Sequence, residues 1–156
     1  MIGYADPTMT PATPAGRPRL VDVSFWCFIA GAVLLILGGL MASSATFEAA
    51  RAALPDTIDD DSVRNYLTIY RSTGIGAVIV GGLVAFLAGR ARRGDARFRL
   101  ALLALVAAIT VVMLLMALGF KVAHPVILLA VLPLLAGAAL FTRPAAAAWY
   151  DPERQR

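Results

Sequence analysis

Four long apolar stretches without a single charged residue dominate this chain of 156 residues. They cover residues 23–42, 72–89, 100–119 and 125–142, which makes them 20, 18, 20 and 18 residues long. A helix needs ~20 apolar residues, and at least ~17, to cross the hydrocarbon core of a bilayer. All four stretches reach that length, the second and the fourth only just. The sequence therefore predicts four transmembrane spans.

Helices are the structure that these stretches favour. Their apolar residues are continuous, whereas a membrane strand alternates with a period of two. Backbone groups in hydrocarbon must also pair within their own segment. The composition agrees, because 60% of the residues are hydrophobic and 15% are charged, against about 45–50% and ~25% in soluble domains. We therefore expect an all-α integral membrane protein, an up-and-down bundle of four transmembrane helices.

The basic residues predict how this bundle is oriented. Ten of the 14 Lys and Arg residues lie in the N-terminal tail, in the loop 90–99 and after residue 142, all on one side of the predicted membrane. The other four lie in the loops 43–71 and 120–124. Short basic segments stay in the cytoplasm. We therefore expect a multi-pass protein of the cell membrane with both termini in the cytoplasm and the loop 43–71 outside.

Three regions follow from this division: a tail at 1–19, a transmembrane domain at 20–144 and a cytoplasmic tail at 145–156. The first tail contains four prolines, and such a composition buries too little apolar surface to become ordered. We therefore expect residues 1–19 to be disordered.

Two helical segments are predicted within the loop 43–71. Residues 46–54 are good helix formers and end before Pro55. Residues 59–62 (DDDS) then supply N-cap candidates and acidic first-turn residues for a helix that continues into the span 72–89.

Small residues at intervals of four predict helix-packing faces in the first two spans. They are Gly38, Ala42, Ala77, Gly81, Ala85 and Gly89. Small side chains allow helix backbones to approach closely in lipid. Two interpretations remain open: the faces join spans of this chain to each other, or they dock a partner membrane protein or a second copy.

The loop 90–99 contains five arginines and one aspartate. The arginines are Arg90, Arg92, Arg93, Arg97 and Arg99. Each basic residue at the inner membrane surface contributes about 1 kcal/mol of attraction to anionic lipids. We therefore predict headgroup contacts with membrane lipids of the inner leaflet, an acidic cytoplasmic partner being the alternative. Asp22, just before the first span, can either reach the headgroup layer or pair with one of the first three of these arginines.

Aromatic residues lie near the predicted cytoplasmic ends of the spans. Trp26 and Phe28 lie near the start of the first span, and Trp149 and Tyr150 follow the fourth. Tyr66 and Tyr70, four residues apart, lie near the outer boundary of the second span. Aromatic residues are enriched at membrane interfaces, so we predict that these six side chains are interfacial anchors.

Residues that could carry chemistry are few. The single histidine, His124, and the single cysteine, Cys27, exclude a haem held by two histidines, a three-histidine zinc site and a cysteine pair within one chain. The run Asp59–Asp61 lacks the glycine turn of a calcium loop, so a solvated helix N-terminus is the favoured interpretation. An acidic or basic residue inside a span is the usual mark of coupled transport, and the four spans contain none. We expect no catalytic residue, no metal and no cofactor, and the absence of a nucleic-acid-binding motif argues against nucleic acid as a partner.

The alanine-rich spans, the segment 17–22 (RPRLVD) and the arginine-dense turn 89–99 resemble the uncharacterised small four-span membrane proteins of high-GC actinobacteria. The resemblance covers the whole chain and implies a four-span fold without implying an activity. Because catalytic groups are lacking and small-residue faces are present, the leading hypothesis is a non-enzymatic accessory or scaffold subunit of a larger membrane assembly. The alternative is an oligomeric transporter or channel for a small solute.

Overall fold

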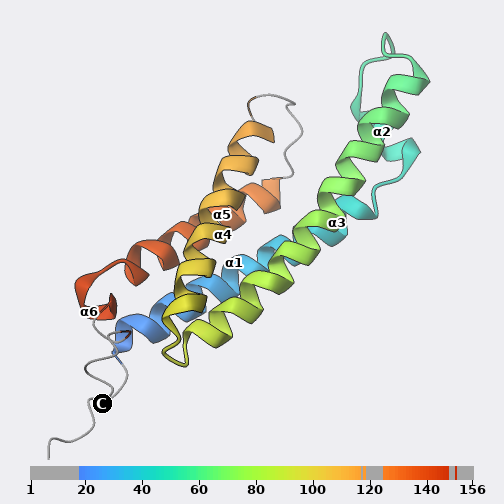
Figure 1. Cartoon of the computed structure of the whole chain (residues 1–156). Coiled ribbons are helices and arrows are strands. Elements are labelled where there is room, and N and C mark those ends of the chain that lie inside the picture. Colours follow the sequence, from blue (N-terminus) through green and yellow to red (C-terminus); the bar gives the residue numbers. More distant parts are fainter. Residues whose placement is uncertain (1–17, 117, 119–124, 148–149, 151–156) are drawn as a thin grey trace, which may run out of the picture.

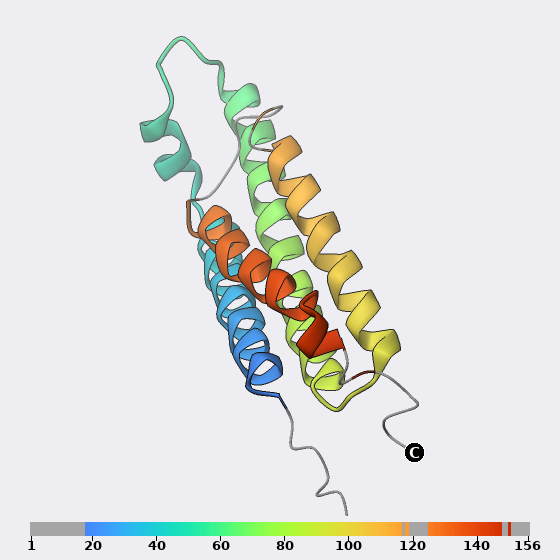
Figure 2. The ribbon, with the colours of Figure 1, turned by 90° about the vertical axis from the view of Figure 1, so that its left-hand side faces the viewer.

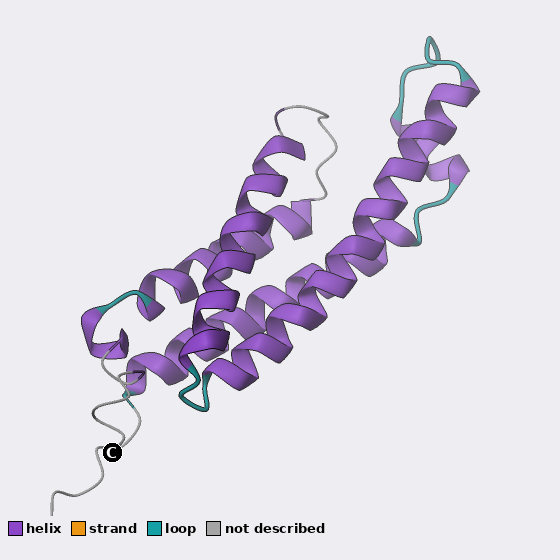
Figure 3. Cartoon of the chain, in the orientation of Figure 1, coloured by secondary structure: helices purple, strands orange, loops and turns teal. Residues whose placement is uncertain are grey.

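The computed structural model describes residues 18–116, 118, 125–147 and 150, and the regular elements of this part are all helices (Figure 1, Figure 3). The long helices are α1 (Arg19–Ser43), α3 (Asp60–Ala91), α4 (Ala96–Leu115) and α5 (Pro125–Phe141), and the short ones are α2 (Phe47–Ala53) and α6 (Pro144–Ala147). The long helices alternate in direction, so that α1 and α4 run one way and α3 and α5 the other (Figure 1).

Three of the long helices, α1, α3 and α4, are long and apolar enough to cross a membrane, with 25, 32 and 20 residues. The helix α5 is also apolar but has only 17 residues. At 1.5 Å per residue it is ~26 Å long, slightly less than the ~30 Å of a bilayer core. These lengths and compositions fit a multi-pass membrane protein.

The helix α1 lies at the centre of the packing, with α3 along one side and α5 along another (Figure 2). The helix α4 lies beside α3 and makes fewer contacts with α5. The rings of Phe28 in α1 and Phe141 in α5 meet edge to face, with 5.2 Å between their centroids. Fully buried side chains are also contributed by Leu35 of α1, Val84 of α3 and Leu134 of α5. The core of the described chain is therefore built mainly by α1, α3 and α5, and α4 adds the buried side chains of Leu102, Val106 and Ile109.

The structure confirms both helices that the sequence predicts in the loop 43–71. The Thr46 hydroxyl accepts a hydrogen bond from the Ala49 amide at 3.3 Å and caps α2. The Asp59 carboxylate caps α3 by accepting from the Ser62 amide at 3.0 Å and from the Ser62 hydroxyl at 2.8 Å. Because α3 begins at Asp60, it extends twelve residues beyond the predicted span, and α2 lies beside that extension (Figure 1).

A tight turn joins α3 to α4 and places them side by side. The chain reverses between Ala91 and Ala96, and Gly94 in this turn has a φ of 92°. Glycine adopts such a left-handed conformation without the steric cost of a Cβ. The Asp95 carboxylate then caps α4 by accepting a hydrogen bond from the Arg97 amide at 2.9 Å.

The predicted tails meet the described residues only at their edges. Of the tail 1–19, Pro18 and Arg19 are described, and Arg19 begins α1. Of the tail 145–156, residues 145–147 and 150 are described, with the first three in α6. The α6 segment lies at the same end of the bundle as the start of α1 and the turn after α3 (Figure 1).

Two of the predicted interfacial anchors are wrong. Phe28 is fully buried because it faces Phe141, and Tyr150 is 5% exposed. The Tyr150 hydroxyl donates a hydrogen bond to the Ala91 carbonyl oxygen at 3.0 Å, which satisfies its polar atom inside the bundle. Trp26 is 63% exposed, as an anchor would be, and Trp149 lies outside the described residues.

Candidate functional site

The most extensive helix contact in the described chain joins α1 to α3, and we call it the α1–α3 seam. On α3 the seam consists of buried residues spaced alternately by three and four: Gly74, Ala77, Gly81, Val84, Ala88 and Ala91. A Cβ atom built on Gly39 of α1 would lie 2.5 Å from the Gly74 carbonyl oxygen, and one on Gly74 would lie 2.6 Å from the Gly39 oxygen. The backbones therefore touch at a point where only glycine fits.

The small-residue ladder predicted on α3 follows the seam for half of its length. Ala77 is 4% exposed, and a Cβ on Gly81 would lie 2.8 Å from Ile36 Cγ1 in α1. Ala85 is only half-buried, and a Cβ on Gly89 would meet no atom within 4 Å. At 3.6 residues per turn, each step of four residues rotates by about 40°, so a strict ladder leaves the contact face.

The two small residues predicted on α1 face different neighbours. Ala42 is 1% exposed and lies against the seam, where a Cβ on Gly74 would meet the Ala42 Cβ at 2.9 Å. Gly38 instead faces α5, because a Cβ there would lie 2.8 Å from Ile127 Cγ1. The structure therefore does not bring the six predicted packing residues together on one interface.

Sequence reasoning missed Gly39 and Gly74 as the point of closest approach. A signal was present, since Gly74, Gly81 and Ala88 are seven residues apart, as are Ala77, Val84 and Ala91. A seven-residue repeat marks the contact line of helices that pack along their length. It was hidden because the remaining faces of α3 within the span are apolar too.

The five arginines of the arginine-rich end (Arg90, Arg92, Arg93, Arg97 and Arg99) have different surroundings. Asp22 pairs with Arg92, with 2.8 Å from Nη2 and 2.9 Å from Nε to the same carboxylate oxygen. The Arg92 guanidinium also lies 4.6 Å from the centre of the Phe25 ring. This ion pair joins the start of α1 to the end of α3, across the end of the seam.

Arg99 forms a second link between helices at this end. Its Nη2 donates a hydrogen bond to the Phe141 carbonyl oxygen at the end of α5, at 2.9 Å. Its guanidinium lies 5.2 Å from the centre of the Tyr150 ring. Arg92 and Arg99 therefore hold the bundle together, whereas Arg90, Arg93 and Arg97 are exposed.

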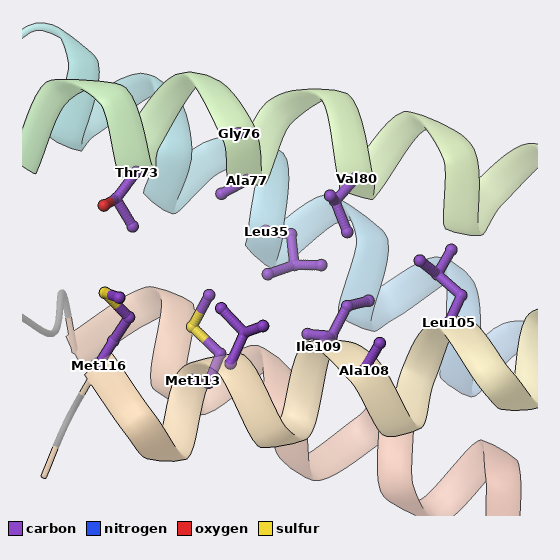
Figure 4. A pocket seen from close by; sticks show the side chains of 11 residues that line it. Leu35, Thr73, Gly76, Ala77, Val80, Leu105, Ala108, Ile109, Met113 and Met116 are labelled. Atoms are coloured by element: carbon purple, nitrogen blue, oxygen red, sulfur yellow. The ribbon is translucent and has the colours of Figure 1, made fainter. Parts of the chain in front are cut away.

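A crevice of about 320 Å³ separates α3 from α4, and we call it the α3–α4 crevice. Figure 4 shows side chains of the two helices facing each other, with Leu35 of α1 behind them. The lining residues are Leu35, Thr73, Gly76, Ala77, Val80, Leu105, Ala108, Ile109, Val112, Met113 and Met116. The Thr73 hydroxyl donates to the Ile69 carbonyl oxygen of its own helix at 2.9 Å. The crevice therefore offers an apolar surface.

The helix α4 is the least buried of the three candidate spans. Only 17% of its apolar window is buried, against 33% for α1 and for α3. A second crevice, of about 230 Å³, lies between α4 and α5. The helix is therefore flanked by apolar gaps on both sides.

The remaining chemical candidates do not gather into a site in the described chain. Within that part, no group of three His, Cys, Asp or Glu residues could hold a metal ion. Asp59 serves as the α3 cap, and the amide and then the hydroxyl of Ser62 lower the pKa of its carboxyl below the ordinary value of 3.8. Cys27 is a free, half-buried thiol, and His124 lies outside the described residues.

Comparisons of the chain with protein-family models, with curated proteins and with solved structures find no match.

Proposed function

We propose that this chain is a non-enzymatic accessory or scaffold subunit of a larger membrane assembly, and that the α3–α4 crevice receives a transmembrane helix of the partner protein. In this proposal all four apolar helices cross the cell membrane, with both termini in the cytoplasm. The observation that carries it is the crevice, which is open, apolar and flanked by the least buried long helix of the described chain.

The shape of the crevice suits a helix better than a polar solute. Its wall runs from Thr73 to Val80 on α3 and from Leu105 to Met116 on α4, or ~10 Å and ~16 Å along the two axes. Gly76 and Ala108 leave room for a close backbone approach. Met113 and Met116 have flexible thioether side chains, which adapt to the shape of a partner.

The charge distribution also supports a role in contact. The stretches 23–42 of α1 and 72–89 of α3 contain no charged residue, and these apolar parts are the ones that face lipid or a partner. Polar groups that would bind a hydrophilic substrate are scarce along the crevice, where the one hydroxyl bonds its own helix.

Site-directed crosslinking in native membranes tests the proposal. In a Cys27→Ser background, the chain has no other cysteine, so Ala108→Cys introduces a unique thiol in the crevice. The matched control is Ile79→Cys, which is 66% exposed on α3 and does not line the crevice. We expect the thiol at 108, but not the one at 79, to crosslink to a helix of a second membrane protein.

A variant that fills the α3–α4 crevice supplies a second test of the proposal. Ala108→Leu should abolish copurification of the crosslinked protein in mild detergent while the unfolding temperature stays the same. Recovery of a lone monomer, with no adduct at position 108, would contradict the proposal. Flux of a small solute into vesicles that contain only this chain would contradict it as well, and would support the transporter or channel alternative.

A further inference from the structure

The arginine-rich end contains a groove that neither the seam nor the α3–α4 crevice uses. It has a volume of about 250 Å³ and is lined by Ala85, Phe86, Gly89, Arg90 and Arg93. These residues lie at the end of α3 and in the turn that follows it, next to the start of α4 (Figure 1). The groove therefore lies where a long apolar helix gives way to charged residues, as at the boundary of a membrane.

Gly89 lines the groove and places no side chain in it. A Cβ built there would meet no atom within 4 Å, so this glycine is not required by helix packing. The same holds for Gly82, two turns earlier on α3, but Gly82 does not line the groove. Gly89 leaves a depression beside two positive charges, with the exposed ring of Phe86 next to it.

The two arginines of the groove have no carboxylate within ion-pair distance among the described residues, whereas Arg92 is paired with Asp22. The described residues of this end include seven arginines, at positions 19, 90, 92, 93, 97, 99 and 143, and two aspartates, at 22 and 95. Asp95 already caps α4. The positive charge at Arg90 and Arg93 is therefore available to an anion.

Aromatic rings hold the Arg90 guanidinium in place. It lies 5.7 Å from the centre of the Phe86 ring and 5.7 Å from the centre of the Phe98 ring, and the two rings meet edge to face at 6.4 Å. Such contacts attract the cation and restrict its side chain. A restrained planar guanidinium is well suited to bind two phosphate oxygens at once.

We propose that Arg90 and Arg93 bind the phosphate group of an anionic phospholipid, and that the start of its acyl chain lies in the groove over Gly89, beside Ala85 and Phe86. Both parts of the ligand are needed to match the surface, because the guanidinium pair suits the phosphate and the apolar depression suits the chain. The proposal requires the chain to lie in a membrane but does not depend on the accessory role.

Lipid retention by the full-length protein tests this site. The protein is inserted into vesicles of equal parts phosphatidylglycerol and phosphatidylcholine, extracted in mild detergent, and its retained lipid is measured by native mass spectrometry. We expect phosphatidylglycerol to be retained in preference to phosphatidylcholine. Arg90→Gln combined with Arg93→Gln should lower that preference at least tenfold, because each basic residue near anionic lipid contributes about fivefold to the attraction and two are removed.

Matched variants separate this site from general surface charge. Arg97→Gln removes an exposed arginine of the same loop that does not line the groove. It should change the preference less than about twofold, because attraction to a charged membrane surface does not hold a lipid on the protein after extraction into detergent. Gly89→Leu fills the groove while the charge stays, and should lower phosphatidylglycerol retention. Gly82→Leu adds the same side chain outside the groove and should not lower it.

Three results would overturn the proposal. Equal losses with Arg97→Gln and with the double arginine variant would show diffuse attraction instead of a site. Retention by Gly89→Leu as strong as in the wild type, in protein with an unchanged circular dichroism spectrum, would show that the groove is not used. Displacement of phosphatidylglycerol by millimolar inorganic phosphate would assign the two arginines to free phosphate.

Discussion

The two sides of α3 differ sharply in how they pack. In the α1–α3 seam, Gly74 and Gly39 bring two backbones into contact. Gly76, two residues after Gly74, instead opens onto the α3–α4 crevice, where a Cβ built on it would meet no atom within 4 Å. Gly74 and Gly76 lie in the same apolar helix and look alike in the sequence. The difference shows that a small residue permits a close contact in lipid but does not create one, because the facing helix must also present its backbone there.

The largest expected effect on stability comes from a pair of variants that each add one methyl group, one on the seam side of α3 and one on its crevice side. Gly74→Ala places a Cβ 2.6 Å from the Gly39 oxygen, which is backbone and cannot move aside. We expect the free energy of unfolding to fall by about 3 kcal/mol or more. Gly76→Ala meets open space and should raise it by about 0.5–1 kcal/mol, the usual gain for Gly to Ala within a helix.

Thermal unfolding in detergent micelles, followed by circular dichroism, measures both variants. Equal effects of the two substitutions would show that the seam and the crevice are packed alike, contrary to the structure.

The ion pair at the end of the seam should have the next largest effect. Asp22 and Arg92 are joined at 2.8 Å with about a third of each side chain exposed. A double-mutant cycle with Asp22→Asn and Arg92→Gln is expected to give a coupling of about 1 kcal/mol, the upper end of the range for partly solvated pairs.

The matched control for that cycle is Arg51 with Asp56, a pair at 3.5 Å whose aspartate is fully exposed. We expect no measurable coupling there. If the coupling energy of Arg51 with Asp56 were as large as that of Asp22 with Arg92, the location of an ion pair at the end of the seam would not strengthen it.

A larger side chain in the crevice should have a smaller effect on stability. Ala108 is exposed on the crevice wall, so Ala108→Leu adds apolar volume where there is room for it. We expect the free energy of unfolding to change by less than about 0.5 kcal/mol, as for most exposed positions. A loss comparable to that of Gly74→Ala would indicate that the crevice closes in the folded protein.

The smallest effect is expected at the start of α3, beyond both the seam and the crevice. The pKa of Asp59 is lowered in the folded chain by the Ser62 amide and hydroxyl. Its carboxylate therefore stabilises the helix start fully above the ordinary value of 3.8, and this contribution is lost as the pH falls through the folded-state pKa. NMR shifts of the Ser62 amide should follow that loss.

Asp59→Asn provides the control, because asparagine also caps helices but does not titrate in this range. We expect the acidic transition of the Ser62 amide to vanish in this variant. A transition that persists unchanged would assign it to another carboxyl, such as Asp60 or Asp61.

Much of the local structure could be predicted from the sequence because it depends on neighbouring residues. Asp59 caps α3 through Ser62, three positions later, and this cap follows from residue type and spacing. Thr46 was placed inside the predicted helix 46–54, and the structure makes it the cap of that helix. The contacts of the candidate site could be predicted less well from the sequence. Asp22 had three possible arginine partners, and the choice of Arg92 depends on how α1 and α3 are rotated against each other.

The sequence by itself determined which segments are helical and apolar, where α3 is capped and which segments collect the arginines. These properties follow from composition and short-range spacing along the chain. Only the tertiary structure decided that Gly39 meets Gly74, that α1 lies between α3 and α5, and that α4 is left with open crevices. The physical reason is that a helix that is apolar on every side carries no hydropathy signal for which face packs, so the fit of small residues against a neighbouring backbone decides.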